Sequence, residues 1–453
     1  MASDIEVLVV GAGACGMAAA IAAHDGGANV AIIEKMERPG GNSSLSTGSV
    51  PAAGSKYQKA AGIDDTPEAM VRDLLAISGG TDAPELVKRM AEVSAPTVEW
   101  LIDDLGARMQ LITAYKHIGH SIQRLHAPIS RRGQDLVDDL LSFVQRRDIP
   151  LAVGNGATDL IAENGAIVGV AMNDGSSIRA DKVILAVNGY AGNRDLVARF
   201  CPEIAGASYF GAHGSTGEAV LWGEKVGAGL ANMAAYQGYA AVAHPHGSLL
   251  SWTTIEKGGI LLNDRAERFG DESIGYSGYA KYVLAQGEFC YAVFDERIFQ
   301  IASQEEEFVE LAKYGGVKSA DDIRALAKIF APDSDKAAAA FDAYNAAAAG
   351  RGADAFGRKD FGLAPLTGRL YGCRVVPGLF HTQGGLKIGM NAEVLKPDGT
   401  PVPNLFAGGG AAAGISGRAG ARGYASGNGL LTAIALGRLA GIAAARQVAG
   451  ARA

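Results

Sequence analysis

The chain has 453 residues, enough for two or three structural domains with sizeable cores, and 48% of them are hydrophobic. Together with 62 glycines, this composition is typical of an α/β enzyme rich in tight turns and excludes a disordered chain. The formal net charge of −7, without any basic run, argues against a nucleic-acid partner. The four cysteines, Cys15, Cys201, Cys290 and Cys373, are scattered without a CxxC pattern, so no metal, iron–sulfur or haem site is predicted and a reducing compartment is expected.

The segment 7–35 predicts a buried strand, a glycine turn, a helix of small residues and a second strand that ends in an acid. Gly11 allows the tight turn, Gly13 lets the backbone approach a pyrophosphate, and Gly16 lets the helix pack on the sheet. The phosphates then meet the helix N-terminus, where unpaired N–H groups favour negative charge. Glu34 stands where a carboxylate accepts hydrogen bonds from a ribose. The segment therefore predicts a site for an adenine dinucleotide.

A second glycine-rich loop, PGGNSSLSTGSV in residues 39–50, follows directly. NAD does not need such a loop, whereas its small residues suit close backbone contact along the ribityl chain and isoalloxazine ring of FAD. FAD is therefore preferred over NAD. The residues predicted to hold FAD in this part of the chain are Gly11, Gly13, Ala14, Gly16, Glu34, Lys35, Gly40, Gly41, Asn42, Ser43, Ser46 and Gly48.

Helices are predicted over residues 66–110, where the first turns are acidic, and over the amphipathic segment 132–149. Short strands follow this second helix. In a flavin enzyme, the backbone near Ala157 is expected to meet the adenine, and the last apolar strand ends at the cofactor with Asn188 and Gly189. Beyond about residue 235 the pattern changes to irregular aromatic segments and strong helices, and from 370 the glycine-rich α/β character returns. One domain is thus predicted to be split by an insertion.

A membrane span is not predicted. The most apolar helical segment, 429–449, carries Arg438 and Arg446, which favours a core or surface helix. No signal peptide precedes the first strand, so a cytoplasmic location is expected.

Nearly the whole chain resembles the flavoprotein superfamily that contains soluble fumarate reductases, succinate dehydrogenase flavoprotein subunits and 3-ketosteroid Δ1-dehydrogenases. The resemblance is carried by GAGACG, PGGNSS, GHSIQRLH, AVNGYAGN, NDRAERFGDE, YNAAAAGRGADAFGR, HTQGGL and GNGLLTAIALGRLAG. It implies an α/β fold in which a Rossmann-like FAD-binding domain is split by an inserted α+β capping domain, with FAD between the two. The implied boundaries are 1–235 for the first part of the FAD-binding domain, 236–361 for the capping domain and 362–453 for the second part.

The resemblance also implies how FAD is held. Asn42 occupies the place where succinate dehydrogenases carry the histidine that links FAD covalently, so FAD is expected to be bound non-covalently. Gly409 replaces a glutamate that binds the ribityl chain in many relatives. The implied FAD contacts of the last part of the chain are Gly408, Gly409, Ser426, Asn428 and Leu430.

Two arginines that dicarboxylate enzymes of this superfamily use are tyrosines here. The arginine that donates a proton to fumarate lies eight residues after the one that matches Arg268, and this position is Tyr276. The arginine that clamps a substrate carboxylate lies four residues before the match of Asn428, and this position is Tyr424. Arginine is an obligate cation that pairs with carboxylates, whereas tyrosine offers a neutral donor or a phenolate base. Tyrosines at both positions resemble the pattern of 3-ketosteroid Δ1-dehydrogenases.

In those dehydrogenases the first tyrosine removes the proton α to a ketone and the second hydrogen-bonds the carbonyl oxygen, helped by a backbone N–H that here belongs to Asn428. An α C–H is acidic enough only when preformed donors stabilise the enolate, and the β-hydride then goes to flavin N5. A phenol with a pKa of about 10 needs neighbours that lower it, and His244 and His381 are candidates. His381 also matches a substrate-contacting histidine of fumarate reductases, so a contact role and a structural role both stay open.

The sequence thus predicts an FAD-dependent oxidoreductase acting on CH–CH groups, which introduces a C=C double bond α,β to a ketone of a cyclic substrate. A small ring such as a cyclohexanone carrying a carboxylate is favoured by the chain length. One alternative is a fumarate reductase-like ene-reductase acting on an enone or unsaturated carboxylate, and another is a non-catalytic electron-transfer subunit that binds FAD. The electron acceptor stays open, as does the question whether Arg418 or Arg422 reaches a substrate carboxylate.

Overall fold

The computed structural model describes residues 5–330 and 333–452, which fall into two compact units. Unit 1 comprises the described residues of 1–202, 211–237 and 381–453, and unit 2 comprises those of 203–210 and 238–380. The second boundary lies at residue 380 and not at the predicted 361, because strand β16 (Leu370–Thr382) pairs with strands β14 (Cys290–Asp295) and β15 (Val317–Ala320) of unit 2. Residues 203–210 join unit 2 for the same reason, since β10 (Ser208–Tyr209) pairs with β16.

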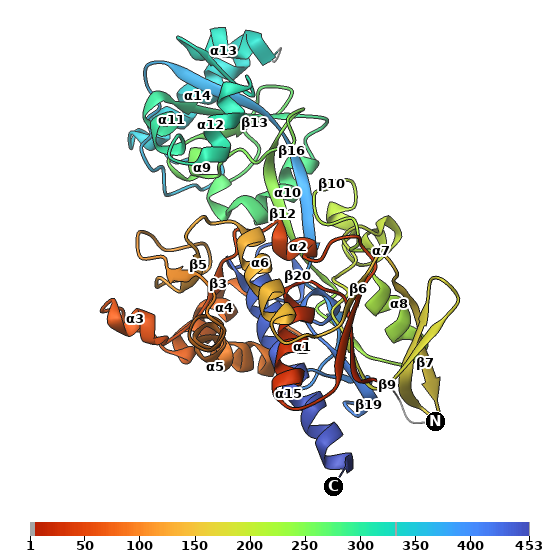
Figure 1. Ribbon diagram of the computed structural model, residues 1–453. Coiled ribbons are helices and arrows are strands. Elements are labelled where there is room, and N and C mark those ends of the chain that lie inside the picture. The colour runs from red at the N-terminus through yellow and green to blue at the C-terminus, as the bar shows by residue number, and fades with distance from the viewer. Residues whose placement is uncertain (1–4, 331–332, 453) are drawn as a thin grey trace. The chain divides into compact units, whose positions relative to one another are not determined.

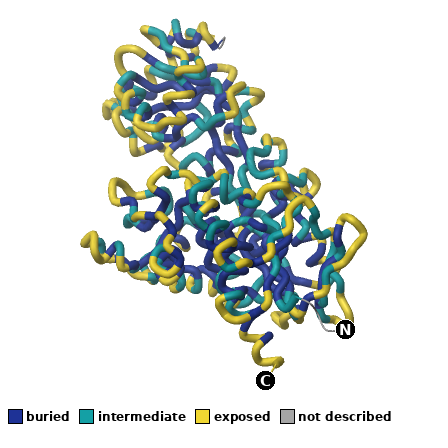
Figure 2. Tube along the Cα trace, in the orientation of Figure 1, coloured by how far each residue is buried: buried dark blue, intermediate teal, exposed yellow. Residues whose placement is uncertain are grey.

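Unit 1 is built on a sheet with five adjacent parallel strands (Figure 1). In spatial order they are β19 (Pro401–Ala407), β9 (Ser177–Leu185), β1 (Ile5–Val10), β2 (Val30–Glu34) and β6 (Leu151–Val153). The apolar runs of the central strands are buried, as is usual where helices cover both faces of a parallel sheet (Figure 2). β18 (Glu393–Leu395), β7 (Ala157–Glu163) and β8 (Ala166–Met172) complete the sheet by antiparallel pairing.

Two helices of small residues pack tightly in unit 1. They are α1 (Ala14–Asp25) and α15 (Asn428–Arg452), which lie side by side in Figure 1. A Cβ atom added at Gly437 would lie 2.2 Å from the carbonyl oxygen of Cys15, and one at Gly441 would lie 2.2 Å from that of Ala19. Only glycine therefore allows this approach of the two backbones.

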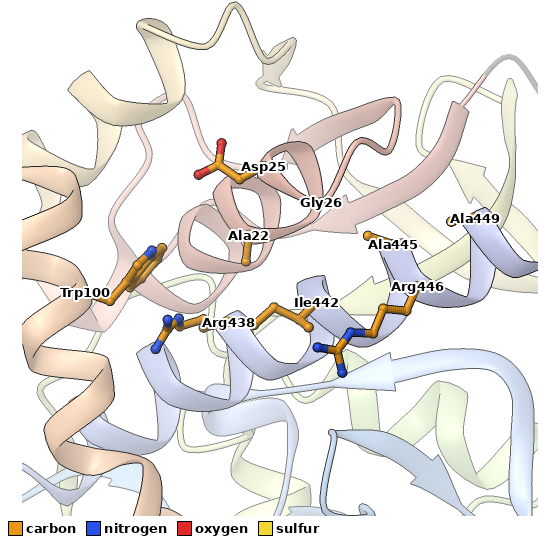
Figure 3. A pocket seen from close by; sticks show the side chains of 9 residues that line it. All are labelled: Ala22, Asp25, Gly26, Trp100, Arg438, Ile442, Ala445, Arg446 and Ala449. Carbon is orange, nitrogen blue, oxygen red and sulfur yellow. The ribbon is translucent and has the colours of Figure 1, made fainter.

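Helix α15 is long and apolar enough to cross a membrane by length and composition, and 72% of its most apolar window is buried inside the structure. This burial is typical of a core helix, and Arg438 stacks on the indole of Trp100 with its guanidinium carbon 4.9 Å from the ring centroid. A hollow of about 410 Å³ opens beside this pair (Figure 3). None of the residues predicted to bind the cofactor or substrate lines it; its lining is Ala22, Asp25, Gly26, Trp100, Arg438, Ile442, Ala445, Arg446 and Ala449.

The remaining elements of unit 1 confirm the predicted helices. Residues 66–110 form α4 (Pro67–Ser78) and α5 (Pro84–Glu99), which continues as the π-helical η1 (Trp100–Leu105), and the amphipathic segment forms α6 (Gly133–Gln145). Thr66 caps α4 by accepting a hydrogen bond from the N–H of Ala69. The other elements are α2 (Gly41–Ser44), β3 (Val50–Pro51), α3 (Lys56–Ala60), β4 (Met109–Leu111), β5 (Leu125–Pro128), α7 (Arg194–Phe200), α8 (Glu218–Lys225), β11 (Leu230–Ala231), β17 (Gly385–Leu386), η4 (Gly409–Ala411) and β20 (Ala419–Gly420).

Unit 2 has its own hydrophobic core, formed between its strands and a layer of helices. β13 (Ile260–Leu262), β14 and β16 pair antiparallel in this order, and β12 (Ala234–Ala243) enters from unit 1. The predicted helices between 300 and 350 are present. The helical elements are α9 (Thr253–Glu256), η3 (Glu272–Ile274), α10 (Tyr276–Leu284), α11 (Glu296–Ala302), α12 (Glu306–Lys313), α13 (Ile323–Phe330) and α14 (Ser334–Ala348).

Candidate active site

The predicted cofactor residues of unit 1 gather where the parallel strands end. Gly11 follows β1, Glu34 is the last residue of β2, Asn188 comes shortly after β9, and Gly408 follows β19. The carboxyl ends of parallel strands meet at one edge of the sheet, which is where α/β folds of this type bind nucleotides. Ala157 is the first residue of β7, and the residues before it reach the same edge: the N–H of Gly154 donates to the carbonyl of Met36 at 3.1 Å, and a Cβ atom added at Gly156 would lie 2.5 Å from the Cβ of Lys35.

The three glycines of the first loop have the geometry that a dinucleotide requires. Gly11 has φ +105°, and an added Cβ atom would lie 2.4 Å from the carbonyl oxygen of Ala186. At Gly16 the added atom would lie 1.8 Å from the carbonyl oxygen of Gly11, so helix α1 packs directly on the turn. At Gly13 the nearest atom is 3.6 Å away, the carbonyl oxygen of Gly40. The protein therefore leaves open the space beside Gly13 that a pyrophosphate would take.

The second glycine-rich loop lies against the first one. Gly40 donates its N–H to the carbonyl of Ala12 at 2.9 Å, and the Ser43 hydroxyl accepts from the N–H of Ala14 at 3.3 Å. Asn42 accepts from the N–H of Ala212 at 2.6 Å, while its Nδ2 group is buried without a hydrogen-bond partner in the described chain. A buried unpaired donor is costly, so this amide is suited to a ligand at the loop.

Glu34 and Lys35 are less open to a ligand than the sequence indicates. One carboxylate oxygen of Glu34 accepts from the N–H of Ala12 and the other from the N–H of Met36, both at 2.8 Å. The ammonium group of Lys35 forms an ion pair with Glu218. A ribose would share the remaining lone pairs of Glu34, and Lys35 could contact a cofactor only through its backbone.

The loops after β9 and β19 approach each other closely. Asn188 has φ +68°, donates to the Ser215 hydroxyl at 2.7 Å and accepts from the N–H of Gly189 at 2.9 Å. At Gly409, which has φ +59°, an added Cβ atom would lie 3.2 Å from the Cβ of Cys15. A glutamate there would be strained, which agrees with the missing ribityl contact.

Tyr424 and His381 lie together at the N-terminus of α15. Their ring centroids are 6.4 Å apart in an edge-to-face arrangement, and the Cε1 of His381 is 3.4 Å from the Cβ position of Gly429. Burial lowers the pKa of His381 to about 4, so the imidazole is neutral at pH 7. The N–H of Asn428, expected to face a ketone, donates to the carbonyl of Ala425 at 3.2 Å. The backbone N–H of Asn428 is therefore already in a hydrogen bond. The side-chain Oδ1 of Asn428, in contrast, is buried without a hydrogen-bond partner in the described chain.

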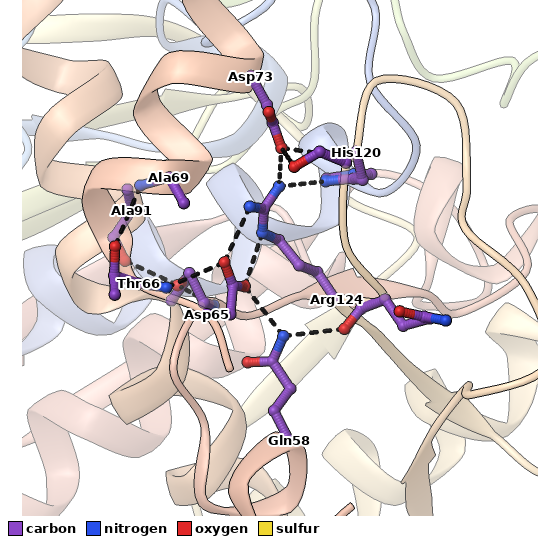
Figure 4. A network of polar contacts seen from close by, with 12 residues as sticks. Gln58, Asp65, Thr66, Ala69, Asp73, Ala91, His120 and Arg124 are labelled. Atoms are coloured by element: carbon purple, nitrogen blue, oxygen red, sulfur yellow. Dashed lines mark hydrogen bonds and ion pairs between the residues drawn. The ribbon is translucent and has the colours of Figure 1, made fainter. Parts of the chain in front are cut away.

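A buried polar network supports the segment that carries Tyr424 (Figure 4). The guanidinium of Arg124 is fully buried and pairs with Asp65 through two hydrogen bonds of 2.7 and 2.9 Å and with Asp73 at 2.5 Å. His120, next to it, hydrogen-bonds through Nε2 to the carbonyl oxygen of Ser426 at 2.9 Å. A carbonyl only accepts, so Nε2 carries the proton, and burial lowers the pKa of His120 to about 4. His120 and Arg124 belong to the GHSIQRLH motif of the sequence, whereas no motif marked the two aspartates.

We expect Arg124→Met to lower the free energy of unfolding by about 3–5 kcal/mol, because it leaves the fully buried carboxylate of Asp65 without its counter-ion. The measurement is denaturant unfolding of the holoenzyme. Arg108→Met is the matched control, since Arg108 pairs with Asp139 at the surface and its loss should change stability little. Equal stability of the two variants would show that the network does not support unit 1.

Tyr276 lies in unit 2, in an aromatic cluster. It is the first residue of α10, directly after Gly275, whose φ of +90° favours glycine. The Tyr276 ring is 5.0 Å from the ring of Tyr239 and 6.4 Å from that of Trp252. Tyr239 is held in place because its hydroxyl donates to the carbonyl of Leu250 at 2.8 Å. No motif in the sequence marks Tyr239 or Trp252, and only the aromatic composition beyond residue 235 hinted at them.

The structure shows the surroundings of three charged or titratable residues that the sequence singled out. His244 packs against Phe289, with the ring centroids 4.8 Å apart. Arg418 forms an ion pair with Asp82 at 2.5 Å on the surface. Arg422 is exposed, and among the described residues it has no hydrogen-bond or ion-pair partner.

A family model described as an FAD binding domain matches residues 6–429. The chain belongs to this family. It is therefore an FAD-dependent flavoprotein of the fumarate reductase and succinate dehydrogenase superfamily. It is 31% identical over 98% of its length to an NADH:fumarate oxidoreductase of Klebsiella pneumoniae (strain 342), of which it spans about half, 48%.

Solved structures show the same fold. A flavocytochrome c3 fumarate reductase in an open conformation matches with a TM-score of 0.84 and 29% identity, over 98% of this chain and 78% of the other. A 3-ketosteroid-Δ4-(5α)-dehydrogenase from Rhodococcus jostii matches with a TM-score of 0.77 and 24% identity, over 98% of both chains. The second likeness shows the fold alone.

The flavoprotein should release its FAD when it is denatured by acid. Asn42 stands where a covalent link would need a nucleophilic side chain, and its amide is not one. Acid precipitation followed by absorbance of the supernatant checks this, with a covalently flavinylated succinate dehydrogenase as the control. Flavin that stays in the precipitate would contradict non-covalent binding.

Proposed function

We propose that the protein is an FAD-dependent dehydrogenase that introduces a C=C double bond α,β to the ketone of a small cyclic substrate. The observation that carries this proposal is the environment of Tyr276. The rings of Tyr239 and Trp252, which lie 5.0 and 6.4 Å from its own ring, are uncharged. Such a surface suits a flat, uncharged ring better than the carboxylate of a dicarboxylic acid.

The placement of Tyr276 also suits a proton acceptor. It begins a helix of nine residues, and the first turn of a helix carries a partial positive charge that stabilises an anion. The helix terminus therefore contributes to the stability of a negative charge on the Tyr276 oxygen. We propose that this oxygen accepts the proton from the carbon next to the ketone.

In unit 1, Tyr424 is the proposed donor to the ketone oxygen. A hydroxyl that donates to the developing enolate oxygen lowers the barrier to loss of the α proton. His381 is neutral at pH 7 and orients the ring of Tyr424 by edge-to-face contact. When bound, FAD supplies a two-electron acceptor for the hydrogen on the β carbon.

The test is anaerobic mixing of the yellow holoenzyme with a panel of cyclic ketones. We expect loss of flavin absorbance at about 450 nm with at least one ketone, because desaturation delivers two electrons to FAD. Saturated cyclic alcohols of the same size are the control. If no ketone bleaches the flavin while an enone or enoate reoxidises the dithionite-reduced enzyme, the ene-reductase alternative replaces this proposal.

Fumarate and succinate should be neither turned over nor tightly bound. Tyr276 and Tyr424 stand where a dicarboxylate would need two cations, and the neutral His381 beside Tyr424 adds no positive charge. Steady-state reduction of fumarate with a reduced viologen dye measures this directly. Fumarate reduction by the wild-type protein would overturn the roles given to both tyrosines.

A second candidate is an ene-reductase that acts on an unsaturated carboxylate. It is favoured by the 31% identity to an NADH:fumarate oxidoreductase. It uses the same cofactor in the opposite direction, so the direction in which the flavin reacts separates the two candidates.

A further inference from the structure

Arg131, an arginine without a carboxylate partner among the described residues, lies in a part of unit 1 in which the sequence indicated no functional residue. Arg131 is half-buried and has φ +57°, a left-handed conformation that is costly for a long side chain. It ends the turn after β5, where its N–H donates to the carbonyl of Pro128 at 3.0 Å. Glycine would adopt this conformation freely, so the arginine is retained at a cost in stability.

The guanidinium of Arg131 is poorly satisfied by the protein. Its Nε atom is buried with no hydrogen-bond partner in the described chain. Its two other nitrogens reach neutral hydroxyls only, Ser49 and Tyr115, each at 3.4 Å. Among the described residues no carboxylate lies within 4 Å of it, which contrasts with Arg124, whose charge is paired twice. A half-buried guanidinium whose N–H groups have no charged acceptor is suited to bind a carboxylate through two parallel hydrogen bonds.

His117 is a second unsatisfied group at the same place. Both of its ring nitrogens are buried and unpaired within the described chain, and its ring is 4.5 Å from that of Tyr115, the residue that Arg131 contacts. Burial and then the charge of Arg131 lower the pKa of His117 to about 4. At pH 7 the imidazole therefore adds a neutral donor, and the charge in this group of residues is that of Arg131.

Both groups border the segment 424–427. On one side, the N–H of Ser426 donates to the carbonyl of Ile118 at 2.9 Å, directly after His117. On the other side, the Cβ position of Gly427 is 2.8 Å from the carbonyl oxygen of Ser49, the residue that Arg131 reaches. The residue after His117 and the residue that Arg131 contacts are thus both adjacent to the segment of Tyr424.

We propose that Arg131 and His117 form a binding subsite for one carboxylate group of the substrate. This assignment rests on the proposed function, and it narrows the substrate to a cyclic ketone with a single acid group. One guanidinium and one neutral imidazole match one carboxylate, whereas a dicarboxylate would need a second cation. Arg422 is the competing candidate, but it is exposed and not held in place by the described residues.

The test measures ligand binding to the FAD-loaded protein by perturbation of the flavin spectrum. The probes are 4-oxocyclohexanecarboxylate against the uncharged 4-methylcyclohexanone, and benzoate against benzamide. Arg131→Gln should raise the Kd of both acids by about 10- to 100-fold, which is the loss of charge-assisted hydrogen bonds, and leave both uncharged probes unchanged. His117→Phe should raise the Kd of the acids by a smaller factor.

Two further variants exclude a general effect on the fold. Arg132→Gln removes the neighbouring exposed arginine and should leave all four Kd values unchanged. Arg131→Gly removes the cation and the backbone strain together, so it should weaken acid binding while keeping or raising the Tm.

The outcomes separate this proposal from the proposed function. Unchanged acid binding in both Arg131 variants, or a loss that follows Arg422→Ala instead, overturns the subsite. Benzoate and benzamide cannot be desaturated, so dependence of benzoate binding on Arg131 supports the subsite even if no ketone bleaches the flavin. If the enzyme oxidises a ketone but the Kd values of the acids do not depend on Arg131, the proposed function is supported and the subsite is refuted.

Discussion

Tyr276→Phe is expected to lower kcat by about 10²-fold or more with little change in KM, because it removes a proton acceptor that is used only in the transition state. The phenylalanine keeps the ring contacts with Tyr239 and Trp252, so the aromatic cluster should stay intact. The measurement is steady-state turnover of the ketone that bleaches the flavin most efficiently, with an artificial electron acceptor.

Tyr282→Phe is the matched control, because Tyr282 lies on the same helix and its side chain is 41% exposed. It should keep wild-type kcat. Tyr424→Phe should also reduce turnover, through weaker stabilisation of the enolate oxygen. If Tyr276→Phe turns over like the wild type, the proton acceptor is another group and the ketone dehydrogenase proposal fails.

Gly13→Ala should produce a folded protein that has lost most of its FAD. The added methyl group meets no protein atom closer than 3.6 Å, so the fold tolerates it. It does enter the space where the backbone must approach the pyrophosphate, and we expect the Kd for FAD to rise by at least about tenfold. Flavin content of the purified protein and reconstitution of the apoprotein with FAD measure the effect.

Substitutions of two other glycines are the controls for this experiment. Gly450→Ala adds a methyl group in open space near the end of α15 and should keep both fold and FAD. Gly16→Ala places a methyl group 1.8 Å from the carbonyl oxygen of Gly11 and should disrupt the fold itself. Full FAD content in Gly13→Ala would mean that the pyrophosphate does not lie at this turn.

Local patterns were sufficient for the nucleotide-binding part of the fold. In residues 5–25 an apolar run forms the strand and a stretch of small residues forms the helix. The turn between them needs Gly11 and Gly16, because a side chain at either position would clash with the neighbouring backbone. The ends of the insertion were predicted less well. The segment 362–380 is glycine-rich at the point where a boundary was expected, but β16 passes through it and pairs with β14 and β15. Pairing between strands distant in sequence leaves no local signature.

The sequence alone determined the cofactor class, because FAD binding depends on a short contiguous segment in which spacing sets the geometry. It also determined that two tyrosines take the place of two arginines. Only the tertiary structure decided which groups are neighbours. It engaged the N–H of Asn428 with the carbonyl of Ala425, and it left the Nε of Arg131 and both ring nitrogens of His117 without hydrogen-bond partners in the described chain. Whether a polar group is satisfied depends on side chains brought together by folding, and the order of residues in the chain does not contain that information.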